Sequence, residues 1–339
     1  MNNILVYCEV EGTKVLPVSQ ELLTKGRTLA NELGVELHAV AIGTSIQTKI
    51  EQDISVYGVD KLFVFDGEGL YPYTSAPHRE ILVKLCKEEQ PQIFLLGATL
   101  LGRDLGPQVS SALNCGLTAD CTELCLGSYT DEVTGVAYDN ILQQMGPAFG
   151  GNIMANIISP HHRPQMATVR EGVMKREKLS DDYPCVVVYP EVSAYVGAEY
   201  FAVQVIDRHV EPPKHNLQGA SVVVAGGYGV GSKKTFDLLF DLAKLLHGEV
   251  GATRPAVDAG WTDYERQIGH TGVTVRPKLF IGVGISGQIQ HVAGMQESAV
   301  IVSINNDPDA PFNKMADYVI VGDAEEVVKE MIKNMMAAV

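Results

Sequence analysis

Short apolar runs alternate with amphipathic stretches over the first hundred residues of the chain. The apolar runs are ILVYCEV from residue 4, VELHAVAIG from residue 35, KLFVFD from residue 61 and QIFLLGA from residue 92. Apolar positions recur with a helical period near residues 17–33, 45–57, 76–89 and 103–113. Strands that alternate with helices in this way predict a parallel sheet with crossover helices, the architecture of a nucleotide-binding-like α/β domain.

The pattern changes over residues 118–170. This region is rich in Thr, Gly and Tyr, and its apolar positions alternate without a helical period. Alternation of this kind is typical of half-buried strands. We therefore expect antiparallel strands here that extend the first sheet.

A second alternating region follows a segment that disfavours regular structure. Residues 206–220, IDRHVEPPKHNLQGA, contain a Pro–Pro pair and mixed charges. Beyond them, the apolar runs SVVVAGG, PKLFIGVG, AVIVSIN and DYVIVGD alternate with helical stretches near residues 232–247, 287–294 and 324–337. The pattern predicts an N-terminal α/β domain (1–205), a linker (206–216) and a smaller, doubly wound α/β domain (217–339). A linker of this composition would let the second domain move.

Composition excludes several classes of protein. The 339 residues are 46% hydrophobic and 20% charged, as in ordinary globular proteins, and no apolar run reaches the ~18 residues that span a bilayer. The net charge of −15 disfavours binding to the phosphate backbone of nucleic acids. The first residues, MNNILVYCEV, lack the features of a signal or transit peptide, so we expect a cytoplasmic protein.

Neither the cysteines nor the paired histidines predict a metal site. The six cysteines form no CxxC pair, so reduced thiols are expected. The spacings between Cys115, Cys121 and Cys125 fit neither zinc nor common iron–sulfur patterns. His161 and His162 stand shortly before a proline, where an exposed loop is expected.

Two glycine-rich turns follow predicted strands of the second domain. Residues 279–305, LFIGVGISGQIQHVAGMQESAVIVSIN, have the order strand, glycine turn, helix, strand, which places a ligand at the edge of a parallel sheet. Glycines let backbone amides approach a phosphate, so we expect a nucleotide cofactor. The turn at 226–231 is also shaped for a phosphate. It lacks the GxGxxG spacing of dinucleotide-binding domains, and no Asp or Glu ends a second strand about twenty residues later. A tight turn made for packing is an equal alternative there.

These segments resemble the electron-transfer flavoprotein α subunit family. The resemblance rests on residues 279–305, on GATRPAVDAGWTDYERQIGHTGVTVRP (251–277) and, in the first domain, on GATLLGRDLGPQVSSAL and PQMATVREG. It extends over most of the chain and implies a C-terminal FAD-binding domain and an obligate β subunit as heterodimer partner. It further implies electron transfer from an acyl-CoA dehydrogenase, as in fatty acid β-oxidation, or from NADH through a flavin on the partner. Some members bifurcate electrons toward acceptors such as ferredoxin or flavodoxin. Conventional electron transfer and bifurcation both stay open for this chain.

The resemblance also implies a set of cofactor contacts. They are Tyr228, Thr253, Arg254, Ile268, Gly269, His270, Thr271, Ser286, Gly287, Gln288, Ile289, Gln290, His291, Asn305, Asp323 and Ala324. The permanent cation of Arg254 would favour reduced, negatively charged flavin and raise its potential. Thr271 is implied to hydrogen-bond flavin N5, and His291 to donate toward the C2 carbonyl. Asn305, Asp323 and Ala324 would bind the adenosine end.

Three positions depart from the family pattern. Tyr228 stands where these loops commonly carry Arg, so a stacking or phenolic contact would replace a charged one. His270 replaces the usual Gln and would place a further redox-tuning, titratable group near the flavin. Phe280 replaces Tyr and removes a hydroxyl. These departures concern redox tuning and leave the expected fold unchanged.

Two other functions stay open. A nicotinamide-dependent oxidoreductase would use the 226–231 turn, although no acid–base residue of a substrate pocket can be identified. A non-redox assembly module would bind an adenine nucleotide structurally. In the first domain, Arg103 and Asp104 stand where a helix begins, and capping and surface pairing are expected of them.

Overall fold

The computed structural model describes residues 3–47, 49–131, 134–148, 153–209 and 215–337. These residues form two compact units, of which the first ends at His209 and the second covers residues 215–337. Residues 210–214, in the middle of the expected linker, lie outside the described residues. Each unit has its own sheet and its own core, so each is described separately.

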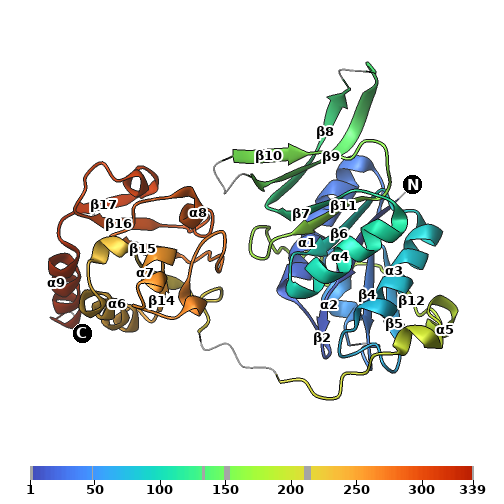
Figure 1. The fold of residues 1–339 in the computed structure, drawn as a ribbon, viewed down its shortest axis with the longest axis horizontal. Coiled ribbons are helices and arrows are strands. Elements are labelled where there is room, and N and C mark those ends of the chain that lie inside the picture. Colours follow the sequence, from blue (N-terminus) through green and yellow to red (C-terminus); the bar gives the residue numbers. More distant parts are fainter. Residues whose placement is uncertain (1–2, 48, 132–133, 149–152, 210–214, 338–339) are drawn as a thin grey trace. The chain divides into compact units, whose positions relative to one another are not determined.

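The first unit is built on a seven-stranded parallel sheet (Figure 1). The strands lie in the order β12–β5–β4–β1–β6–β11–β7, and every neighbouring pair is parallel. Their bounds are β1 (Asn3–Cys8), β4 (Glu36–Gly43), β5 (Lys61–Asp66), β6 (Ile93–Gly97), β7 (Leu117–Cys121), β11 (Gln165–Val169) and β12 (Val186–Val188). The alternating sequence pattern is thereby confirmed as a parallel α/β sheet.

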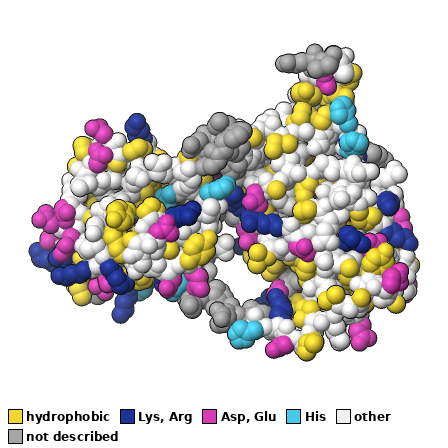
Figure 2. Space-filling view, in the orientation of Figure 1, with side chains coloured by type: hydrophobic (Ala, Val, Ile, Leu, Met, Phe, Trp, Pro, Cys, Tyr) yellow, Lys and Arg dark blue, Asp and Glu magenta, His cyan; other side chains and the backbone are white. Residues whose placement is uncertain are grey.

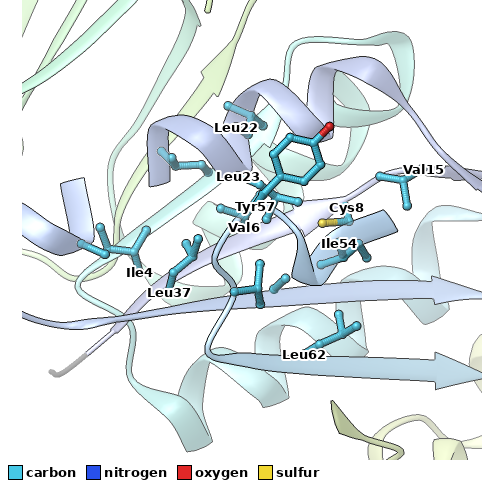
Figure 3. Close-up of a cluster of buried hydrophobic side chains, with 14 of the residues drawn as sticks. Ile4, Val6, Cys8, Val15, Leu22, Leu23, Leu37, Ile54, Tyr57 and Leu62 are labelled. Carbon is cyan, nitrogen blue, oxygen red and sulfur yellow. The ribbon is translucent and has the colours of Figure 1, made fainter. Parts of the chain in front are cut away.

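Helices cover both faces of this sheet because its strands are apolar on both sides. Ile4 and Val6 of β1 pack with Leu22 and Leu23 on one face (Figure 3), while Leu5 packs into the cluster on the other face. The helices are α1 (Pro17–Leu33), α2 (Glu51–Ser55), α3 (Ser75–Glu89), α4 (Leu100–Leu113), α5 (Val192–Tyr195) and the 3-10 helix η2 (Ala198–Phe201). A short hairpin is formed by β2 (Val10–Glu11) and β3 (Lys14–Val15).

Three antiparallel strands form a sheet of their own. They are β8 (Glu123–Thr130), β9 (Ala137–Ala148) and β10 (Ile153–Ile157), in the order β10–β9–β8. The expectation that such strands extend the first sheet was therefore wrong. Only the two ends of that region, β7 and β11, join the main sheet, and they do so in parallel. Alternation identified the strands, but it carries no information about which sheet pairs with them.

A buried carboxylate occupies the crevice where the first sheet reverses its winding direction. The chain adds β4 and β5 on one side of β1 and then crosses to β6 on the other side, so ligands of such sheets would bind between β1 and β6. Glu9 follows β1 there and is 2% exposed. Its two carboxylate oxygens lie 2.9 and 2.8 Å from Oγ1 of Thr99, the residue that caps α4. Burial raises the pKa of this carboxyl to about 7. An acidic group at this point disfavours a phosphate in the first unit.

The second unit is a five-stranded parallel sheet in the order β14–β13–β15–β16–β17. Its strands are β13 (Val222–Gly226), β14 (Glu249–Ala252), β15 (Leu279–Val283), β16 (Ile301–Asn305) and β17 (Tyr318–Val321). Its helices are α6 (Lys233–Leu245), α7 (Arg254–Asp258), α8 (Ile289–Val292) and α9 (Ala324–Ala337), with the 3-10 turns η3 (Tyr228–Val230), η4 (Tyr264–Arg266) and η5 (Pro311–Met315). The hydroxyl of Ser232 accepts from the Thr235 amide at 3.1 Å and so caps the N-terminus of α6.

Charged side chains of both signs are interspersed over the visible face of each unit (Figure 2). No helix in the described part of the chain is both long enough and apolar enough to cross a membrane. All six cysteines are free thiols. Among the residues with described positions, no group of three or more His, Cys, Asp or Glu side chains is placed to hold a metal ion.

Candidate functional site

A cavity of about 770 Å³ lies at the carboxyl edge of the second sheet. The chain places β14 on one side of β13 and β15 on the other, so the winding direction reverses between β13 and β15. The wall follows the edge from Thr253, after β14, to Asn305, at the end of β16. This path crosses three strand spacings, or about 14 Å, which suits an elongated ligand better than a compact one. The volume of the cavity is that of a typical cofactor pocket.

The two glycine turns pack directly against each other beside this cavity. The Gly227 amide donates to the Val283 carbonyl at 2.8 Å, and the Gly229 amide donates to the Gly284 carbonyl at 3.0 Å. A Cβ atom at Gly227 would lie 2.2 Å from the Gly284 oxygen. Both amides are therefore engaged within the protein and are not available to a phosphate. The geometry of the 226–231 turn therefore favours a packing role over phosphate binding.

His291 lines the cavity and has one side-chain nitrogen without a hydrogen-bond partner among the described residues. The residue is 6% exposed, and its Nδ1 lies 3.0 Å from the carbonyl oxygen of Ile268. Its Nε2 is buried and has no hydrogen-bond partner among the described residues. The rings of Phe280 and Phe312 lie 6.1 and 6.5 Å away between centroids. Burial in these apolar surroundings lowers the pKa of the imidazole to about 4. The ring is therefore neutral at pH 7, and Nε2 can still take a polar partner.

Arg254 supplies an exposed positive charge on the same wall. It is the first residue of α7, it is followed by Pro255, and its side chain is 68% exposed. Its Nε lies 3.4 Å from the carboxylate of Asp258, one helical turn later. A surface pair of this kind is weak, so the guanidinium can turn to a ligand at small cost. Thr253, which lines the cavity beside it, is buried.

The loop at residues 267–271 is shaped by close backbone contacts. The His270 amide donates to the Gln290 carbonyl at 2.6 Å. Gly269 has φ +140°, and a Cβ atom there would lie 2.5 Å from the Gln290 oxygen, so only glycine fits. Nε2 of Gln267 donates to Oγ1 of Thr271 at 2.9 Å, which orients that hydroxyl. The loop therefore presents backbone and hydroxyl groups to the cavity in fixed positions.

The far end of the cavity is polar. The Asn305 side chain donates to the Ile285 carbonyl at 2.9 Å and accepts from the Asp307 amide at 3.1 Å. Asp323 lies one strand further along the edge, where Oδ1 accepts from the amides of Glu325 and Glu326 at 2.9 and 3.1 Å. Its carboxylate thus caps α9.

Most residues that the resemblance implied are brought together by the fold. Those that line the cavity are Tyr228, Thr253, Arg254, Ile268, Gly269, His270, Thr271, Ser286, Gln288, Gln290, His291 and Asn305. Those implied residues that are not on its wall are Gly287, Ile289, Asp323 and Ala324. Further lining residues that are not among the implied cofactor contacts are Gly227, Gly229, Pro255, Gln267, Gly284, Ile285, Asp307, Ala310 and Pro311. Of these, Gly227 and Gly284 directly follow β13 and β15, in the two glycine turns that the sequence had indicated.

The polar groups on the cavity wall fit FAD. The elongated wall matches an extended dinucleotide, and Nε2 of His291 is a buried polar atom that requires a ligand partner. Arg254, Thr271 and His291 would hold the flavin end, and Asn305 the adenosine end.

Comparisons with known proteins place both units in one family. Residues 4–194 match the electron transfer flavoprotein domain, and residues 216–296 match the electron transfer flavoprotein FAD-binding domain. The chain is 42% identical to Protein FixB of Clostridium saccharobutylicum, over 97% of this chain and 95% of that one. It is 41% identical to the electron transfer flavoprotein subunit alpha of Thermoanaerobacterium thermosaccharolyticum, over 98% and 97%. It is 38% identical to subunit LctC of the lactate dehydrogenase (NAD(+),ferredoxin) of Acetobacterium woodii, over 97% and 76%.

Proposed function

The chain belongs to the electron transfer flavoprotein α-subunit family, and from this premise we propose that it is the FAD-binding subunit of an electron-carrying heterodimer. Its partner is an electron transfer flavoprotein β subunit. Electrons arrive from an acyl-CoA dehydrogenase, or from NADH through a flavin on the partner, and leave from the flavin of the second unit. FAD as the cofactor is supported by the FAD-binding domain match and by the relatives.

The observation that carries this proposal is the combination of two groups on one cavity wall. Arg254 presents a permanent positive charge, and His291 has a buried nitrogen that no described residue pairs with. FAD, when bound, supplies one- and two-electron chemistry, and its reduced forms carry more negative charge than the oxidised form. A guanidinium in the site stabilises the added charge and raises the flavin potential.

His291 can donate a hydrogen bond from Nε2 only when its imidazole is protonated on both nitrogens. Because a carbonyl oxygen can only accept, Nδ1 carries the proton and donates to Ile268 at 3.0 Å. In the neutral ring, Nε2 then holds a lone pair, and it donates toward the cofactor only after the ring gains a second proton. Negative charge beside Nε2 raises the pKa of the imidazole and favours this second proton. His291 therefore holds a proton at Nε2 when the site gains negative charge, and releases it when the charge is lost.

A bifurcating mode is a second candidate, and one observation favours it. The relative from Acetobacterium woodii is named as a subunit of an NAD(+)- and ferredoxin-dependent lactate dehydrogenase. If this chain works in the same manner, NADH would reduce a second FAD on the β subunit, and ferredoxin or flavodoxin would be an acceptor. The conventional and bifurcating modes differ in the number of flavins per heterodimer.

The test is flavin analysis of the heterodimer copurified with its β subunit. We expect bound FAD with a visible flavin spectrum, one per heterodimer for a conventional carrier and two for a bifurcating complex. Arg254→Gln should leave the FAD bound but make its potential more negative. A heterodimer that retains no FAD, even after reconstitution, would refute the proposed function. NADH bound by a colourless heterodimer would favour the nicotinamide-dependent alternative.

A further inference from the structure

A second cavity, of about 350 Å³, lies in the first unit and shares no residue with the cofactor cavity. Tyr7 and Ile42 line it from the carboxyl ends of the neighbouring strands β1 and β4. His78 lines it from the first turn of α3, and Leu100 and Leu101 line it from the start of α4. The carboxyl edge of a parallel sheet is where open α/β folds bind their ligands. The volume is less than half that of the cofactor cavity, so it suits a molecule of one ring and not a dinucleotide.

The charged residues on the wall of this cavity, Glu11 and Arg208, neutralise each other. Nη1 and Nη2 of Arg208 lie 2.5 and 2.9 Å from the two carboxylate oxygens of Glu11. The Tyr71 hydroxyl donates to Glu11 at 2.8 Å and accepts from Arg208 at 2.6 Å, while the Tyr73 hydroxyl donates to Asp104 at 2.7 Å. The described residues of the wall therefore offer no unbalanced charge. An ionised ligand would lose its hydration there without gaining a counter-charge.

Two buried side chains on the same wall each keep one polar atom without a partner among the described residues. Tyr7 and His78 are both only 2% exposed. The Tyr7 hydroxyl makes no hydrogen bond within the described part of the chain. Nδ1 of His78 lies 3.0 Å from the Thr74 carbonyl oxygen, whereas its Nε2 meets no donor or acceptor of the described residues. Buried polar groups are normally paired, so two such atoms on one wall indicate a polar occupant.

The protonation of these two side chains defines the partner that each requires. A carbonyl oxygen only accepts, so Nδ1 of His78 carries the proton. Burial lowers the pKa of His78 to about 4, so the ring is neutral at pH 7 and Nε2 is an acceptor. Burial raises the pKa of Tyr7 well above its usual value, so the phenol keeps its proton and can donate. The occupant must supply a donor to His78 and an acceptor to Tyr7, and a single hydroxyl group supplies both.

We propose that this cavity binds a small, uncharged aromatic molecule that carries a hydroxyl group. The rings of Tyr7, Tyr71 and Tyr73 contribute to its wall, and aromatic walls favour a flat ring as the occupant. The hydroxyl of the ligand donates to Nε2 of His78 and accepts from Tyr7. The paired charges of the wall exclude carboxylates and phosphates. This site is independent of FAD and of the proposed electron transfer.

The test is a ligand-observed NMR titration of the FAD-loaded heterodimer with phenol, toluene and benzoate. Phenol and toluene have the same shape and differ in the hydroxyl group, while benzoate carries a charge. Phenol should bind with a dissociation constant on the order of 1 mM, and about two- to tenfold more tightly than toluene, which is the range expected for one net hydrogen bond. Benzoate should bind at least about tenfold more weakly than phenol, because its charge has no partner.

Two variants assign the binding to this cavity. Tyr7→Phe removes only the unpaired hydroxyl and therefore keeps the fold, and His78→Phe removes the acceptor but keeps a ring. Each should weaken phenol binding about two- to tenfold and leave toluene binding unchanged. Tyr57→Phe is the matched control, because Tyr57 is also buried in the first unit but belongs to the cluster on the other face of the sheet and does not line the cavity.

Three outcomes would overturn the inference. The first is a heterodimer that binds no phenol, as expected if the cavity holds only water or is covered by the β subunit. The second is equal affinity for phenol and toluene, or for phenol and benzoate. The third is phenol binding that Tyr7→Phe does not weaken, and this outcome can be read even if His78→Phe fails to fold.

Discussion

Glu9→Gln should stabilise the first unit at alkaline pH and have little effect at acidic pH. The Glu9 carboxyl is 2% exposed, and burial raises its pKa to about 7 against an ordinary value of 4.5. The nearby negative charge of Glu171 adds to this rise, while the Thr99 hydroxyl opposes it. A glutamine amide oxygen can still accept from Thr99, so the substitution removes the ionisation and keeps the hydrogen bond.

The sign and the magnitude follow from proton linkage. Between pH 4.5 and 7 the native state binds more protons at Glu9 than the unfolded state, so the stability contributed by this group is lost as pH rises through 7. The difference between the two pKa values corresponds to about 3 kcal/mol. The stability gain of Glu9→Gln should therefore grow from less than about 1 kcal/mol at pH 5 to about 3 kcal/mol at pH 8. For a unit of this size, that is a rise in Tm of about 6–12 °C.

The assay is thermal unfolding of the wild-type and variant heterodimers at pH 5 and pH 8. His78 is also buried in the first unit, and burial lowers its pKa to about 4, so its linkage has the opposite sign between pH 4 and 6.5. That contribution is common to both proteins and disappears in the difference between them. A Tm difference that is equal at the two pH values would show that Glu9 is ionised normally in the native state and would refute the reasoning.

Three further outcomes are expected in the second unit. Arg254→Gln should make the flavin potential more negative in a spectroelectrochemical titration, and Arg254→Lys should restore part of the loss, whereas an unchanged potential would remove Arg254 from redox tuning. Burial lowers the pKa of the His291 imidazole to about 4, so the flavin-free unit should lose about 3 kcal/mol of unfolding free energy as pH falls from 6.5 to 4. In urea titrations, His291→Gln should flatten this pH dependence. Gly227→Ala places a Cβ atom 2.2 Å from the Gly284 oxygen, so it should lower the free energy of unfolding by about 1–3 kcal/mol in the same urea titration. An unchanged free energy of unfolding would contradict the packing role of the turn.

The parallel sheets were predictable because their strands carry the signal locally. β1 is buried at all six of its positions, and such a strand needs helices on both faces. The predicted helices at residues 17–33 and 324–337 agree with α1 and α9 at both ends. The separate β8–β10 sheet was not predictable, because pairing between strands depends on partners that are distant in sequence. Local alternation is the same whether a strand extends one sheet or starts another.

The location of the cofactor site was predictable from the sequence, but the hydrogen-bond partners of each side chain were not. Topology places a ligand at the carboxyl edge between β13 and β15, and the sequence order of the strands already implies this edge. Asp323 also ends a strand, yet the amides at the start of α9 take up one of its carboxylate oxygens. A carboxylate after a strand and before a helix suits both a ribose hydroxyl and a helix cap. The contacts of Asp323 in the folded chain decide between these two roles.

The two units use the same topological position in opposite ways. At the reversal point of the first sheet, the chain places Glu9, a buried carboxyl group that accepts from the Thr99 hydroxyl. At the reversal point of the second sheet, it places glycines whose backbones pack against each other, and the adjoining cavity is lined by Arg254 and by His291, whose Nε2 has no partner within the described part of the chain. A buried ionisable carboxyl costs stability, whereas an unpaired buried imidazole nitrogen costs stability only until a ligand meets it. The fold thus offers two equivalent crevices, and the residues at the strand ends direct the cofactor to the second.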